Sequence, residues 1–162
     1  MNRFSRLLAL STLAMLGACG KNSPDVAQTE TATAAPETKP GLALSGGKLV
    51  LPAVKGNPAA AYFTLANGSG KPVSIAAIEV AGAGMAMMHE TKQVAGHSEM
   101  VMLDNPTIAP GASLVFARGG KHVMVMDPPA DLKPGETVEL TLTFSDGDKL
   151  SAPLGIVGPA GE

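Results

Sequence analysis

From about residue 46 onward, short segments alternate apolar and polar residues, and turn-forming residues separate them. In the clearest segment, Glu136 to Phe144, the apolar residues Val138, Leu140 and Leu142 share one side with Phe144. Alternation with a period of two predicts a β-strand that is buried on one face. No ten-residue stretch of this part shows the period of a helix, so we expect an all-β domain.

Further strands are expected at residues 60–66 and 73–80, on either side of a turn at residues 67–70. Asp146-Gly147 predicts a hairpin turn into a strand at residues 149–157. In the segment 73–80 the apolar positions slip by one residue, which predicts a β-bulge near Ala76-Ala77. Short strands at this spacing predict a single antiparallel domain, either a sandwich or a Greek-key barrel.

The first 18 residues have the pattern of a lipoprotein signal peptide. Arg3 and Arg6 precede an apolar stretch at residues 7–16, and the stretch leads into Leu16-Gly-Ala-Cys19. This ending resembles the bacterial lipobox, so Cys19 is expected to carry lipid and to anchor the protein on the periplasmic side of a membrane. Gly20 in place of Asp favours the outer membrane. The alternative is an ordinary signal peptide that contains a cysteine.

Residues 19–45 are expected to form a lipidated, flexible tether. This segment has almost no large apolar side chains and is rich in Thr, Ala, Pro and Glu. Such a composition cannot bury enough apolar surface to offset the entropy lost on ordering. We therefore predict that the folded domain occupies residues 46–162.

Charge and cysteine content exclude several kinds of protein. The formal net charge is −2 and no basic cluster occurs, which argues against a nucleic-acid partner. Cys19 is the only cysteine, so the chain can form no internal disulfide and has no spare thiolate. A blue-copper electron-transfer centre needs a cysteine ligand and is therefore excluded.

Histidine and methionine gather in one part of the chain. All three histidines and seven of the nine methionines lie between Met85 and Met126. Imidazole nitrogen and thioether sulfur together suit Cu(I), which is a soft ion. The cluster predicts a copper site in an exported protein.

These residues alternate along three segments that could lie side by side in a sheet. The segments contain Met85, Met87 and His89; Met100 and Met102; and His122, Met124 and Met126. Methionine also fills cores, so Met87, Met102 and Met126 could serve either as core residues or as secondary ligands. Met85 and Met88 are expected to be non-ligands. His97 is expected in a turn, where it could only assist the metal.

The spacing His89-x10-Met100-x21-His122-x-Met124 resembles that of periplasmic copper chaperones of the PCu(A)C type. The segment 119–126, Gly-Gly-Lys-His-Val-Met-Val-Met, resembles the metal-binding strand of that family, and residues 132–147 resemble its closing segment. The resemblance covers about residues 46–154.

The resemblance implies a cupredoxin-like Greek-key β-sandwich and an exposed Cu(I) site formed by His89, Met100, His122 and Met124. It implies a chaperone, not an enzyme, that delivers copper to the binuclear site of cytochrome c oxidase subunit II or works beside a Sco-type copper protein. The alternatives are a copper-buffering or resistance lipoprotein without a dedicated acceptor and, less well supported, a small copper enzyme or electron-transfer protein.

Overall fold

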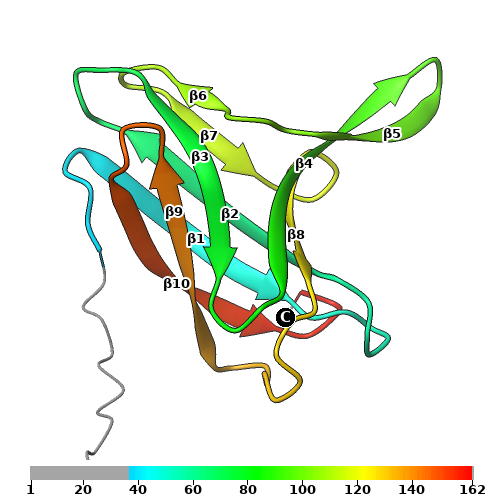
Figure 1. Ribbon diagram of the computed structural model, residues 1–162. Coiled ribbons are helices and arrows are strands. Elements are labelled where there is room, and N and C mark those ends of the chain that lie inside the picture. Colours follow the sequence, from blue (N-terminus) through cyan, green and yellow to red (C-terminus); the bar gives the residue numbers. More distant parts are fainter. Residues whose placement is uncertain (1–36, 162) are drawn as a thin grey trace, which may run out of the picture. The chain divides into compact units, whose positions relative to one another are not determined.

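A computed structural model describes residues 37–161, which contain ten β-strands and no helix (Figure 1). The prediction of an all-β domain is confirmed. No helix in this described part of the chain is long and apolar enough to cross a membrane. The strands are β1 (Leu42–Val50), β2 (Ala59–Asn67), β3 (Val73–Val80), β4 (Met85–Val94), β5 (His97–Met102), β6 (Thr107–Ile108), β7 (Ser113–Phe116), β8 (Lys121–Met126), β9 (Thr137–Phe144) and β10 (Lys149–Val157).

The strands follow one hydrogen-bonded path, in the order β5-β4-β8-β2-β1-β10-β9-β3-β6, and β7 also pairs with β2. Most pairs are antiparallel, whereas β1 and β10 run parallel. The path folds over so that β3 and β9 lie in front of β1 and β2 (Figure 1). Non-sequential neighbours such as β8-β2 and β1-β10 give the crossed connections of a Greek-key type of fold.

The core forms where the inner faces of these strands meet. Buried side chains from β2, β3, β8, β9 and β10 belong to one hydrophobic cluster. Phe63 and Phe116 stack in it with ring centroids 4.5 Å apart. In β9 the buried residues are the four that the alternation predicts: Val138, Leu140, Leu142 and Phe144.

The predicted hairpin after β9 and the predicted bulge in β3 are confirmed. Asp146-Gly147 turns β9 into β10, which pairs with it along its length. The register between β3 and β9 shifts between Ile75 and Ala77, where the bulge is predicted. The turn at residues 67–70 connects β2 to β3, but these strands pair with other partners.

The first strand begins at Leu42, inside the segment expected to be tether, whereas Cys19 and the signal peptide lie outside the described residues. Leu42 and Leu44 pack against the core. Lys39 is 9% exposed, and its ammonium group contacts Asp146 at 2.5 Å and Asp148 at 2.6 Å. It also lies 5.2 Å from the centre of the Phe144 ring. This ion pair attaches the entry of the domain to the β9–β10 turn.

The same ion pair shifts the titration of its members. Burial by itself would lower the pKa of Lys39, but the hydrogen bonds to Asp146 and Asp148 outweigh burial and raise it. The hydrogen bond from Lys39 lowers the pKa of Asp146. The aspartate therefore contributes stability above its unfolded pKa, and this contribution is lost as the pH falls through the folded pKa. The lysine contribution is lost only as the pH rises through its own raised pKa.

We expect Lys39→Met to lower the melting temperature at about pH 7, and we expect the difference from the unchanged protein to shrink as the pH falls below about 4, through the lowered folded pKa of Asp146. Lys55→Met, at an exposed lysine, is the matched control and should change little. Thermal unfolding followed by circular dichroism at several pH values measures both. A difference that stays constant down to low pH would contradict an electrostatic role for Lys39.

Candidate metal centre

Three neighbouring strands carry the histidine and methionine segments, as the alternation predicts. β4 lies between β5 and β8 and pairs antiparallel with both. Residues directly opposite each other in an antiparallel pair project from the same face. On β8 the inward residues are Val123 and Val125, which are fully buried. The residues that alternate with them therefore project from the outer face.

His89 and His122 are directly opposite each other on β4 and β8. Their rings have centroids 5.9 Å apart and are tilted by 59°. Both side chains are half-buried, so the rings are partly shielded from solvent but accessible from outside. This pair brings two imidazoles close enough for one nitrogen of each to bind a single ion.

The turn before β8 orients the His122 ring. Gly119 has φ +77°, a conformation that suits glycine, and the Gly120 amide donates to the Ala117 carbonyl at 3.1 Å. The Gly120 carbonyl then accepts from the Thr91 amide at 3.1 Å and lies 3.0 Å from His122 Nδ1. A carbonyl can only accept, so Nδ1 carries the proton and Nε2 has a free lone pair. A second contact of this kind is typical of a metal-binding histidine.

His89 has the complementary feature. Its Nδ1 is the only buried side-chain nitrogen or oxygen within residues 37–161 that has no hydrogen-bond partner. A buried polar atom without a partner costs about 1–3 kcal/mol. Coordination of a metal ion by the ring would offset such a cost. No protein group satisfies this atom, which favours a role as a ligand over a purely structural role.

Thioethers surround the imidazole pair on the same face. Met124 follows His122 by two residues, and neighbours at this spacing lie about 6.6 Å apart along a strand. On β5, Met102 is directly opposite His89, and Met100 is opposite Thr91, one row further towards the hairpin tip. Met100 and Met102 are 52% and 58% exposed. The structure therefore gathers His89, His122 and Met124 and offers two methionines of β5 as a fourth ligand.

The other candidate ligands fall into three kinds of position: the outer face, the core and the hairpin tip. Met87 and Met126 lie on the outer face and outside the core, opposite Met124 and Met85. Met88 is 7% exposed and belongs to the core. His97 pairs with Val94 at the tip of the β4–β5 hairpin, and its register places it on the opposite face from Met100 and Met102. The structure does not bring His97 to the imidazole pair.

A cross-strand ion pair next to the histidines supports the register. Lys121 contacts Glu90 at 2.8 Å, and the two residues are directly opposite each other, one position along from the histidine pair. The hydrogen bond from Lys121 lowers the pKa of Glu90. Because the charges lie on the other face of the strands, they fix the pairing of β4 and β8 without competing for the metal.

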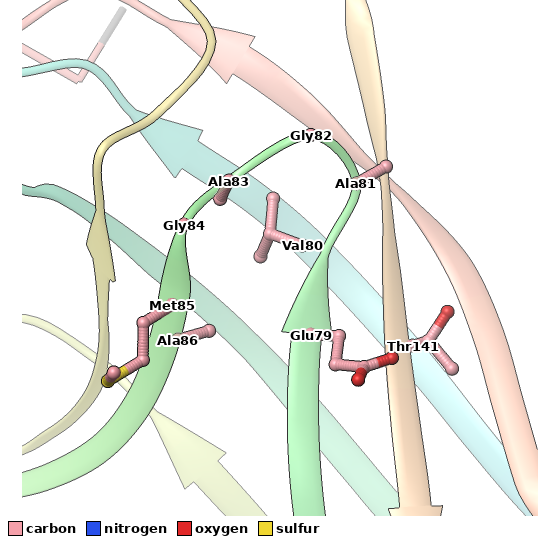
Figure 2. A pocket seen from close by; sticks show the side chains of 9 residues that line it. All are labelled: Glu79, Val80, Ala81, Gly82, Ala83, Gly84, Met85, Ala86 and Thr141. Atoms are coloured by element: carbon pink, nitrogen blue, oxygen red, sulfur yellow. The ribbon is translucent and has the colours of Figure 1, made fainter.

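Two observations set the chemistry of the centre. Within residues 37–161, no three His, Cys, Asp or Glu residues come together as a metal site, and the soft donors beside the imidazole pair are thioethers. A hollow of about 310 Å³ at the β3–β4 connection includes Met85 but neither histidine (Figure 2). The imidazole pair lies on the outer face of β4 and β8, outside this hollow. Neutral nitrogen and sulfur ligands on an open face suit reversible binding of Cu(I).

Similarity to known proteins agrees with this class of domain. Residues 27–155 match the family described as putative lipoprotein LpqE-like, and the chain belongs to that family. It is 32% identical to a protein of Leifsonia xyli subsp. xyli, also described as a putative lipoprotein, over 91% of this chain and 87% of that protein. It is 33% identical over 88 residues to a Rickettsia prowazekii protein described as uncharacterized; this match covers 54% of this chain and spans 49% of the relative.

Solved structures identify the fold. The Cu(I)-bound solution structure of a Deinococcus radiodurans protein is 33% identical, with a TM-score of 0.55, and the match covers 81% of this chain and 85% of that one. The copper-bound PCuAC domain of PmoF2 has a TM-score of 0.61 at 19% identity, covering 77% and 99%. The expected cupredoxin-like fold and the resemblance to the PCu(A)C type are confirmed.

Proposed function

We propose that the protein is an extracytoplasmic Cu(I) chaperone. Its site consists of His89, His122 and Met124 from β4 and β8, with Met100 from β5 as the fourth ligand. The observation that carries the proposal is the imidazole pair, in which the Gly120 carbonyl orients one ring and the other ring has a buried nitrogen without a partner. The Deinococcus relative, whose structure was solved with Cu(I), supports the choice of ion.

The exposure of the site supports a carrier over an enzyme or an electron-transfer protein. The β4–β5 hairpin projects from the rest of the strands, and Met100 on it is more than half exposed (Figure 1). An acceptor could approach this hairpin and replace one thioether at a time. Neutral thioethers bind Cu(I) without forming disulfides, which suits an oxidising compartment.

The acceptor that we propose is the binuclear copper site of cytochrome c oxidase subunit II, reached directly or through a Sco-type copper protein. We further propose that Cys19 is lipidated and holds the domain on the periplasmic side of a membrane, the outer membrane being favoured. The family description and the Leifsonia relative, both named as lipoproteins, support anchoring. An anchored carrier can transfer copper only to acceptors within reach of its tether.

We expect Cu(I) to pass directly from the loaded protein to the apo copper domain of an oxidase subunit II. NMR spectra of both proteins would follow the transfer, with and without a chelator that scavenges free copper. Direct transfer should persist in the presence of the scavenger, because the ion moves through shared-ligand intermediates. The variant with His89 and His122 both changed to alanine is the control, because it lacks the proposed histidine-containing site and should transfer no copper from it. Transfer that stops when free copper is scavenged would instead support a copper-buffering lipoprotein.

A further inference from the structure

The outer face of β4 and β8 carries more soft ligands than one copper ion needs. Three successive rows on this face pair one residue of β4 with one of β8: His89 with His122, Met87 with Met124, and Met85 with Met126. Beyond the histidine row, all positions of this ladder are thioethers. If Met124 binds the first ion, three sulfurs remain next to it.

Packing does not account for these three methionines. None of them belongs to the hydrophobic core, and Met85 is 57% exposed. Met87 and Met126 are half-buried on the face that points away from the core. Met88, between Met85 and His89 in the chain, supplies the contrast because it is buried and explained by packing alone.

The register allows the three sulfurs to meet. Cβ atoms of directly opposite residues, such as those of Met85 and Met126, lie about 4.5–5.5 Å apart. Met85 and Met87 are two residues apart on one strand, about 6.6 Å. Methionine is unbranched and flexible, so the sulfurs can converge from these positions. Figure 2 shows the side chains of Met85 and Ala86 leaving β4 in opposite directions.

The end of the ladder is also negatively charged. The Gly84 amide donates to the Met126 carbonyl at 3.1 Å, which closes the last row. A Cβ placed on Gly84 would lie 3.0 Å from the Asp127 carboxylate, so this carboxylate lies directly beside the row. A hard carboxylate is a poor ligand for Cu(I), but its charge attracts a cation to the neutral sulfurs.

We propose that Met85, Met87 and Met126 form a second Cu(I) site, made of three thioethers, next to the histidine-containing site. The set has no nitrogen ligand and no formal charge, so it selects a soft monovalent ion and holds it more weakly than the first site does. Copper enters or leaves along the ladder, because Met87 and Met124 are directly opposite each other and can exchange one ion. The inference rests on the proposed function in taking Cu(I) as the cargo, but it uses neither histidine.

The test is a Cu(I) titration of the full chain without oxygen, with X-ray absorption spectra recorded at one and two equivalents. We expect two bound ions, the first with mixed nitrogen and sulfur neighbours and the second with sulfur only. The double variant Met85→Leu with Met126→Leu should lose the second ion and keep the mixed first site. Met88→Leu, a change of similar volume in the core, is the matched control and should keep both ions.

The double variant His89→Ala with His122→Ala separates this proposal from the proposed function. It should still bind one Cu(I) with a sulfur-only shell. That result, together with an absence of transfer by the unchanged protein, would uphold the second site and reject the chaperone. The second site is wrong if the unchanged protein binds one equivalent, if nitrogen surrounds the second ion, or if the leucine double variant still binds two.

Discussion

Replacing His122 with alanine is expected to weaken Cu(I) binding at the histidine-containing site by about 100-fold or more, whereas His97→Ala should leave it unchanged. Loss of an outer contact of a metal ligand already costs about 10–100-fold in affinity, so loss of the ligand itself should cost at least the upper end of this range. A 100-fold loss corresponds to about 2.7 kcal/mol.

His122 and His97 make a matched pair of positions for this experiment. Both lie on strands of the same three-stranded region, and both changes remove one imidazole. They differ in position, because His122 is opposite His89 in the ladder and His97 is at the hairpin tip on the other face. A non-specific loss of imidazole, or a general effect on β-strand stability, would therefore affect both variants.

Competition with a chromophoric Cu(I) chelator measures the affinity, and circular dichroism checks that each variant is folded. Titration at low copper loading confines the measurement to the tighter site. Equal weakening by both changes would show that His97 also binds the ion. An unchanged affinity in His122→Ala would remove the imidazole pair from the site.

Much of this centre is predictable from the sequence, because the alternation of residues along a strand determines which side chains share a face. Once β8 is recognised as a strand, Val123 and Val125 must point one way and His122 and Met124 the other. The same rule predicts the buried side of β9. These predictions depend only on residues close together in the chain, so a single sequence is sufficient for them.

The pairing of distant strands was not predictable in the same way. Alternation predicts from which face of its strand each of His89 and Met102 projects. It does not predict that His89 lies opposite both His122 and Met102. That register depends on contacts such as Glu90 with Lys121, which join residues far apart in the chain. The sequence likewise did not predict that Met85, expected to be a non-ligand, lies opposite Met126.

Two tertiary contacts, one at the metal site and one at the entry of the domain, were also not predictable from the sequence. Gly119-Gly120 belongs to the segment that resembles the family's metal-binding strand, but nothing in it indicated that the Gly120 carbonyl would orient His122 and join β4 at the same time. Likewise, Lys39 lies in a segment of tether-like composition, and only the folded chain brings it between Asp146 and Asp148. Both contacts depend on tertiary structure and not on local composition.

The adjacent residues Met87 and Met88 offer the second large effect, since strand alternation places them on opposite faces of β4. Met88→Ala is expected to lower the free energy of unfolding by about 2–5 kcal/mol, because it removes a buried side chain and leaves a cavity in the core. This is a large part of the 5–15 kcal/mol typical of a domain. Its copper ligands are untouched, so the folded variant should bind Cu(I) with unchanged stoichiometry.

Met87→Ala is expected to behave in the opposite way, with little change in stability and loss of the second copper equivalent. Its side chain is half-buried on the outer face, so truncation leaves no cavity in the core. Urea unfolding of the copper-free proteins measures stability, and Cu(I) titration in the cold, where both variants are folded, measures stoichiometry. Two equally destabilised variants would mean that the outer face of β4 packs as tightly as its inner face. Loss of copper in Met88→Ala, but not in Met87→Ala, would reverse the assignment of the two faces of β4.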